Sequence, residues 1–98
     1  MIRAGIIGGA GYTAGELIRL LVNHPLAEIA FVHSTSNAGN HLAQVHGGLE
    51  GDTGMLICDA YDLGAIDVLF LCSAHGQSRV WMEENSIPAG VKIIDLAQ

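Results

Sequence analysis

The chain has 98 residues, of which 50% are hydrophobic and 14% are charged. This composition excludes an intrinsically disordered chain, which requires low hydrophobicity and a high density of charge. The length matches one small domain, and no stretch has the composition of a linker, so we expect residues 1–98 to form a single folding unit.

The formal net charge of −6 argues against nucleic acid or an anionic membrane surface as a partner, because the four Lys and Arg residues are scattered along the chain. No apolar run approaches the roughly 18–20 residues of a membrane span, and the N-terminus lacks the pattern of a signal peptide. The two cysteines, Cys58 and Cys72, are too few for a disulfide framework and are not spaced as Cys-x-x-Cys, so we expect a cytoplasmic protein with reduced thiols. The histidines have no ligand-like spacing, so we expect no metal site.

The first third of the chain predicts one βαβ unit. Residues 2–7 form an apolar run that ends in glycines, which is typical of a strand buried on both faces. Apolar residues then recur with helical spacing over residues 14–21, and Pro25 predicts the end of that helix. Residues 28–33 predict the second strand.

The middle of the chain is less regular. Residues 34–53 are polar and glycine-rich, with one or two helical turns expected around residues 41–45, and residues 55–58 resemble a short third strand. Residues 67–72 give a much stronger strand signal, since they are aliphatic and aromatic almost throughout.

The last third predicts a helix and a final strand. The helix is expected over residues 77–85, with Val80 and Met82 or Trp81 turned inward, and the strand over residues 91–96. Strands that alternate with helices at this spacing predict an α/β fold: a doubly wound parallel sheet of the Rossmann type, with helices on both faces.

A glycine turn joins the first strand to the first helix. It reads as G-x-G-x-x-A on Gly9, Gly11 and Ala14, or as G-x-x-G-x-x-A if it begins at Gly8. Such a turn lets the backbone approach a pyrophosphate, and the helix N-terminus offers free N–H groups to the anion. The alternative is that the glycines only permit a tight crossover. We expect a dinucleotide site here, formed by Gly8, Gly9, Ala10, Gly11, Tyr12, Thr13 and Ala14.

The end of the second strand favours NADP over NAD. An NAD site usually has an acidic residue about 20 residues beyond the glycines, to hold the ribose 2′-hydroxyl. Here no acidic residue occurs between Glu28 and Glu50, and the strand leads into Ser34, Thr35 and Ser36. Hydroxyl groups can donate hydrogen bonds to a 2′-phosphate, whereas a carboxylate would repel it. The alternative is that these polar residues simply begin a loop.

A loop of small residues follows the strong strand at residues 67–72. Ligands bind beyond the carboxyl ends of parallel strands, so we expect Ser73, Ala74, His75 and Gly76 to lie beneath the nicotinamide or the pyrophosphate. Cys72 and His75 also suggest a nucleophile and its base, but a free cysteine that ends an apolar strand is more often a small buried hydrophobe. We therefore expect no catalytic residue in this chain.

The motifs together resemble the N-acetyl-γ-glutamyl-phosphate reductase family over nearly the whole chain. Residues 8–21, with Gly-Tyr-Thr in the turn and Glu-Leu opening the helix, are similar to the start of that family. Residues 46–51, the His-Gly loop within residues 71–78 and the Ile-Asp-Leu of residues 94–96 are similar to its later segments. Gly47, Ala74 and Ala97 depart from the residues that many members have.

The resemblance implies an NADP-dependent oxidoreductase of arginine biosynthesis in the cytoplasm, which is a homo-oligomer at full length. A thiolate attacks an acyl phosphate, phosphate leaves, and NADPH reduces the thioester to an aldehyde. The family's catalytic cysteine and histidine belong to a second domain, and no position here matches them. Residues 1–98 would therefore be the N-terminal, dinucleotide-binding portion of a cut chain, inactive alone, with the acyl-phosphate substrate bound by the absent domain.

Two other interpretations stay open. An aspartate-semialdehyde dehydrogenase-like domain has a similar glycine turn, although Tyr12-Thr13 and His75-Gly76 favour the reductase. A non-catalytic NADP-sensing module would have the same binding motif without a catalytic partner domain.

Overall fold

The computed structural model describes residues 1–8, 12–34, 39, 57–58, 60–73 and 77–96. Its elements follow one another as strand β1 (Ile2–Ile7), helix α1 (Tyr12–Val22), strand β2 (Ala27–His33), 3-10 helix η1 (Leu63–Ala65), strand β3 (Val68–Leu71), helix α3 (Gln77–Glu84) and strand β4 (Lys92–Asp95). The helix expected around residues 41–45 lies outside the described residues.

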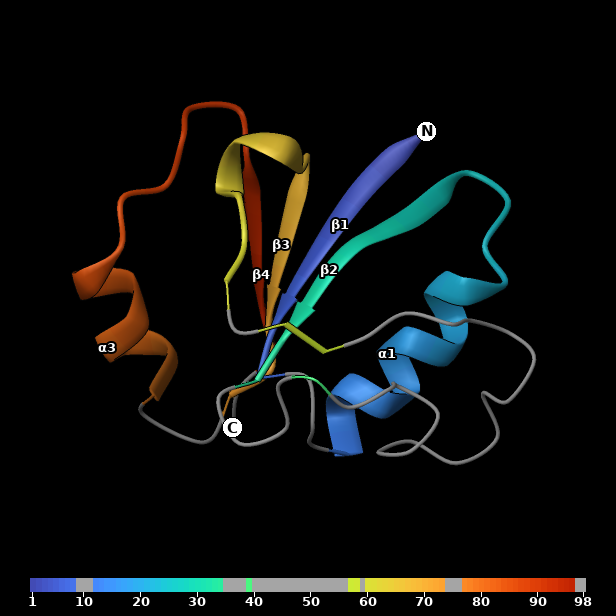
Figure 1. Cartoon of the computed structure of the whole chain (residues 1–98), viewed down its shortest axis with the longest axis horizontal. Helices are drawn as coiled ribbons and strands as arrows, with labels where there is room; N and C mark the ends of the chain where they lie inside the picture. The colour runs from blue at the N-terminus through green and yellow to red at the C-terminus, as the bar shows by residue number, and fades with distance from the viewer. Residues whose placement is uncertain (9–11, 35–38, 40–56, 59, 74–76, 97–98) are drawn as a thin grey trace.

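The four strands form one parallel sheet in the order β2-β1-β3-β4, with helices on both faces (Figure 1). This confirms the predicted doubly wound α/β architecture. Cys58 makes an isolated parallel bridge to His33, and its N–H donates to the carbonyl of Val32 at 2.8 Å. The third strand expected over residues 55–58 is thus represented, within the described residues, by this bridge alone.

Strand β1 is central, and its second half is inaccessible from both faces, as predicted: Ala4, Gly5, Ile6 and Ile7 are buried. Gly5 has a specific reason to be glycine. A Cβ at this position would overlap the ring of Phe31, so only a residue without a side chain lets that ring pack across the strand.

Helix α1 forms because its apolar residues recur at helical spacing and face the sheet. Ala14 and Ile18 are fully buried, whereas Leu20 on the outer side is 71% exposed. The helix ends at Val22, three residues before Pro25, as the proline predicts. The Asn23 side chain caps the last turn by donating to the Arg19 carbonyl at 3.2 Å.

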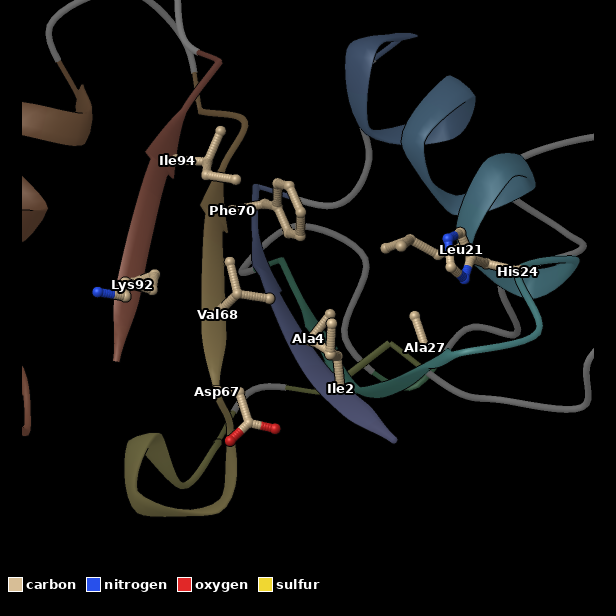
Figure 2. Close-up of a pocket in the computed structure, with 10 residues that line it drawn as sticks. All are labelled: Ile2, Ala4, Leu21, His24, Ala27, Asp67, Val68, Phe70, Lys92 and Ile94. Carbon is tan, nitrogen blue, oxygen red and sulfur yellow. The ribbon is translucent and has the colours of Figure 1, made fainter. Parts of the chain in front are cut away.

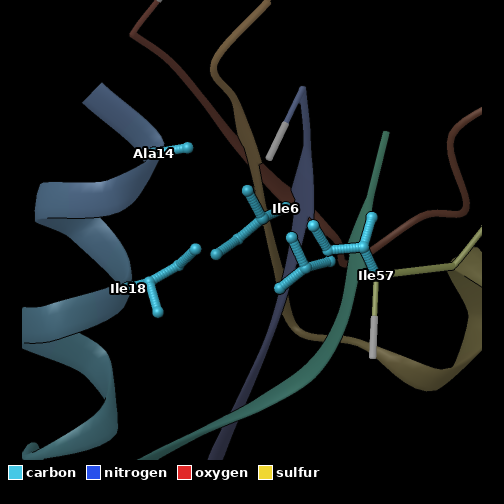
Figure 3. Packing of buried hydrophobic residues seen from close by; sticks show 5 residues of the cluster. Ile6, Ala14, Ile18 and Ile57 are labelled. Carbon is cyan, nitrogen blue, oxygen red and sulfur yellow. The ribbon is translucent and has the colours of Figure 1, made fainter. Parts of the chain in front are cut away.

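Two apolar clusters lie on opposite faces of the sheet. The first, between the sheet and α1, contains Ile6, Ala14, Ile18, Val32 and Ile57 (Figure 3). The second contains Ile7, Phe31, Ile66, Leu69 and Leu71, and packs against residues of η1, α3 and the segment between α3 and β4. The interior of the domain is therefore divided by the sheet into two layers.

The inward face of α3 differs from part of the sequence prediction. Trp81 packs against the second cluster, as one alternative held, but Val80 and Met82 are 51% and 42% exposed. The reason is a specific contact: the Trp81 indole N–H donates to the Tyr61 hydroxyl at 2.8 Å. The Tyr61 ring in turn stacks on Phe31 with 5.0 Å between centroids, so the largest side chain of the helix sets its rotation.

Candidate dinucleotide-binding site

The carboxyl ends of the three strands β2, β1 and β3 meet at one edge of the sheet. The Gly8 N–H donates to the His33 carbonyl at 3.0 Å, and the Cys72 N–H donates to the Ile7 carbonyl at 2.8 Å. The residues that follow these strands therefore lie side by side. Ligands of doubly wound sheets bind outside this edge, where neighbouring crossovers run to opposite faces.

Gly8 lies directly against the loop that follows β3. Its φ is +82°, and a Cβ built on it would lie 2.7 Å from the Ser73 nitrogen and 2.8 Å from the Ser73 Oγ. Two segments that the sequence proposed separately for cofactor binding are thus in contact, although they are more than sixty residues apart in the chain. Only glycine combines this backbone conformation with so close an approach.

Helix α1 begins at Tyr12, immediately after the glycine turn, so the N–H groups of its first turn point toward the same edge. They supply the partial positive charge that a pyrophosphate requires. Thr13 is half-buried and Ala14 is fully buried against the first apolar cluster. Ala14 therefore fills the third position of the motif, where a small residue allows the helix to pack closely on the strand.

Ser34, which follows β2, is only 7% exposed, and its N–H donates to the Cys58 carbonyl at 3.3 Å. Ser34 therefore belongs to the hydrogen-bonded, buried end of the sheet. The predicted contact with a 2′-phosphate therefore depends mainly on Thr35 and Ser36, which lie outside the described residues. The same is true of the other expected cofactor residues Gly9, Ala10, Gly11, Ala74, His75 and Gly76.

Cys72 is held in the thiol form. Burial and, secondarily, the negative charge of Asp95 raise the pKa of Cys72 to about 11. A nucleophilic cysteine requires the opposite shift, so this environment agrees with the interpretation of Cys72 as a small buried hydrophobe. Its proposed partner His75 lies outside the described residues.

The proximity of Asp95 to Cys72 is a feature of this edge that the sequence analysis missed. Asp95 ends β4, and Cys72 directly follows Leu71, the last residue of β3, with which Asp95 is paired in the parallel register. This proximity could have been found by aligning the two apolar runs as neighbouring parallel strands, because Cys72 and Asp95 both lie at the carboxyl ends of those runs. Asp95 thus brings a negative charge to the end of β4.

In the described part of the chain, no helix is long and apolar enough to cross a membrane. Nor do its His, Cys, Asp and Glu side chains gather in any group of three or more that would hold a metal ion.

Gly8, the N-terminus of α1 and Ser73 thus lie together at the carboxyl edge of a doubly wound parallel sheet. This combination defines a Rossmann-type dinucleotide-binding domain. The semialdehyde dehydrogenase NAD-binding domain family matches residues 3–98, and the chain belongs to that family.

Curated relatives are similar over almost the whole chain. The N-acetyl-γ-glutamyl-phosphate reductases of Bacteroides thetaiotaomicron and Parabacteroides distasonis are 60% and 58% identical over 97 residues, and that of Flavobacterium johnsoniae is 49% identical over 96 residues. These matches cover 98–99% of this chain but only 29–30% of each relative. The chain therefore spans about a third of the length of these enzymes.

A solved structure shares the fold. The crystal structure of aspartate semialdehyde dehydrogenase with NADP from Candida albicans matches with a TM-score of 0.79 and 20% sequence identity. The match covers all of this chain and 30% of that one. It supports the architecture described above, including the arrangement of the strands.

Replacing Gly8 by alanine is expected to destabilise the domain and to weaken dinucleotide binding. The positive φ alone costs about 1–2 kcal/mol for a residue with a Cβ, and the contact with Ser73 adds to this because backbone atoms must move. Gly90→Ala is the matched control, since Gly90 has a φ of +93° and no atom within 4 Å of an added Cβ. Urea unfolding and NADPH titration of both variants provide the test. Equal losses in the two variants would show that the contact with Ser73 contributes nothing.

The raised pKa of Cys72 predicts slow alkylation in the folded chain. At pH 8 we expect iodoacetamide to modify Cys72 on the order of 100-fold more slowly than it does in urea, because thiolate is the reactive form. The unfolded thiol also ionises first, so the free energy of unfolding should fall as the pH rises from about 9 to about 11. Peptide mass spectrometry separates Cys72 from Cys58. A rate at pH 8 that matches the unfolded chain would contradict the protonated state.

Proposed function

We propose that these residues are the NADP(H)-binding part of a longer reductase that converts N-acetyl-γ-glutamyl phosphate to N-acetylglutamate semialdehyde. In this reaction a hydride from NADPH replaces the phosphate on the acyl carbon, and inorganic phosphate and NADP⁺ are released. The observation that carries the proposal is the identity of 60% over 97 residues with a relative of that name. The contact between Gly8 and Ser73 at the carboxyl edge supports it, because both belong to the segments expected to bind the cofactor.

The role proposed for this chain is positioning. NADPH supplies the hydride when it is bound, and the residues of the carboxyl edge hold the dinucleotide so that its nicotinamide faces the acyl group. The N-terminus of α1 would bind the pyrophosphate, and the loop that begins at Ser73 would support the nicotinamide half. The protonated thiol of Cys72 supports a site without a nucleophile of its own, so we propose that the catalytic cysteine and histidine lie in the remaining part of the longer protein.

The preference for NADP over NAD is part of the proposal. The C. albicans relative by fold was crystallised with NADP, and no carboxylate follows β2 here before Glu50. We also propose the cytoplasm as the location of the longer enzyme, because its substrate and cofactor are small soluble metabolites. A homo-oligomer is proposed as its assembly because the resemblance to the reductase family implies one.

An aspartate-semialdehyde dehydrogenase is the second candidate, because the matching family and the solved structure both bear the semialdehyde dehydrogenase name. The identity of 20% with that structure is far below the 49–60% shared with the reductases, which favours the first candidate. A non-catalytic NADP sensor would differ from both enzymes because it would bind NADPH without reducing either acyl phosphate.

A chimera provides the test of function. Residues 1–98 would replace the matching segment of the Bacteroides thetaiotaomicron relative, which retains the remainder of that enzyme. We expect NADPH-dependent reduction of N-acetyl-γ-glutamyl phosphate by the chimera, and no turnover by the 98-residue chain alone. Activity with aspartyl phosphate in place of the acetylated substrate would favour the second candidate. A folded chimera that binds NADPH without reducing either substrate would favour the sensor.

The preference for NADP is tested by calorimetry on the same chimera. We expect NADPH to bind at least about tenfold more tightly than NADH, which corresponds to about 1.4 kcal/mol. Thr35→Glu should weaken NADPH binding and narrow this ratio, because a carboxylate beside the 2′-phosphate is repulsive. Ser86→Glu adds the same charge at an exposed position after α3 and should leave the ratio unchanged. Equal affinities for the two cofactors in the unsubstituted chimera would overturn the preference.

A further inference from the structure

The 2′-phosphate of NADP requires a positive charge, and this chain has few side chains that carry one. A site that prefers NADP normally has an arginine near the end of the second strand, because charged donors hold a phosphate more strongly than hydroxyl groups do. The chain contains four Lys and Arg residues, and the structure describes all of them. None occurs in residues 20–78, which include β2 and the segment that follows it.

Arg3 and Lys92 lie toward the opposite edge of the sheet, at the start of β1 and of β4. Arg3 pairs with Glu28 at 3.3 Å between Nε and Oε1, and a strand rises about 3.3 Å per residue, so Arg3 is roughly 13 Å from Ile7. Lys92 and His24 line an open, mainly apolar groove of about 440 Å³ beside the C-terminal end of α1 (Figure 2). Neither cation adjoins the carboxyl end of β2.

The two remaining arginines lie on helices and pair with glutamates of the same helix. Arg19 donates to Glu16 Oε1 at 2.8 Å, and it is two turns beyond the N-terminus of α1. The Nε of Arg79 lies 3.6 Å from Oε1 of Glu83, and the Arg79 side chain is 86% exposed on α3. The usual arginine partner of a 2′-phosphate is therefore missing at the end of β2.

His33 is the last residue of β2 and lies at the position that a 2′-phosphate would approach. It stands about 20 residues beyond the glycine turn, where dinucleotide sites recognise the adenosine ribose. Its carbonyl accepts the Gly8 N–H at 3.0 Å, so it adjoins that turn. Its half-buried side chain meets the Tyr61 ring edge to face, with 4.8 Å between centroids and an angle of 74°. This contact restricts the orientation of the imidazole ring.

The described groups packed around His33 supply no other positive charge. Cys58 forms the parallel bridge to it, Tyr61 contacts its ring, and β1 pairs with it through an aliphatic residue. The carboxylates of the same elements are engaged elsewhere. Asp62 accepts a hydrogen bond from an N–H of η1 at 2.9 Å, and Glu28 pairs with β1 near the other end of the strand.

We propose that His33 recognises the 2′-phosphate through its protonated imidazole, so that the preference for NADP rises as the pH falls. This inference rests on the proposed function and names a specificity-determining residue of the same site. An imidazole ordinarily titrates near pH 6.5, and a neighbouring phosphate favours its charged form. The phosphate itself remains anionic in this range. At higher pH the imidazole is neutral and the hydroxyl groups of Thr35 and Ser36 remain as donors, which weakens the preference.

Calorimetry on the chimera described above, at pH 6.5 and at pH 8.5, tests the pH dependence. We expect the ratio of NADPH affinity to NADH affinity to be about three- to tenfold higher at pH 6.5, as for a partly exposed ion pair. NADH is the internal control, because it presents the same pyrophosphate and nicotinamide without a 2′-phosphate. The contributions of groups that contact these shared parts cancel in the ratio.

Three variants test which residue is responsible. His33→Asn should remove the pH dependence and lower the ratio at pH 6.5 to its value at pH 8.5. His33→Arg should give a high ratio at both pH values, because a guanidinium stays charged. His24→Asn is the matched control: His24 follows α1 near the opposite edge of the sheet, so the ratio and its pH dependence should not change.

A ratio that is independent of pH, or a pH dependence that persists in His33→Asn, would overturn the proposal. Equal losses of NADPH and NADH affinity in both His33 variants would also overturn it, because His33 would then serve the glycine turn and not the phosphate. A strong preference for NADPH that ignores both pH and His33 would overturn this inference and leave the proposed function intact. Equal affinities for the two cofactors at both pH values would overturn the proposed NADP preference as well.

Discussion

The central position of β1 is the constraint on which the rest of the structure depends. Because β1 pairs with β2 on one side and with β3 on the other, its last residues are enclosed by both neighbours. Gly5 and Gly8 make this possible, since the Phe31 ring and the Ser73 backbone occupy the space that their side chains would need. The glycines are therefore required for space as well as for conformation. If β1 lay farther from β2 and β3, the glycine turn would move away from the loop after β3, and the candidate site would be divided.

Much of the fold could be predicted from the sequence because burial leaves a local periodic pattern. The apolar runs at residues 2–7 and 67–72 identified strands, and the spacing from Ala14 to Leu21 identified the buried face of α1. Pro25 marked the end of the helix because proline restricts the residue before it. The glycine turn then placed the candidate site at the carboxyl edge, where Gly8 is indeed found.

The remaining features depend on contacts between residues distant in sequence. The rotation of α3 follows from the bond between Trp81 and Tyr61, and no periodicity within the helix indicates that partner. The charge beside Cys72 follows from the register of β3 with β4, which brings Asp95 next to it. The burial of Ser34 follows from its pairing with Cys58, so a residue that reads as the start of a polar loop is part of the sheet's end.

The apolar composition has two distinct physical origins. One is the pair of clusters that the sheet separates, and these contain most of the buried hydrophobic residues. The other is the row from Ile6 to Ile94, which continues the first cluster beyond the reach of α1 and leaves apolar surface exposed. Right-handed crossovers cannot cover that row with the helices of these βαβ units, because α3 must pass on the opposite face. The strand order that assembles the candidate cofactor edge therefore also creates the uncovered groove, and the two features follow from a single choice of topology.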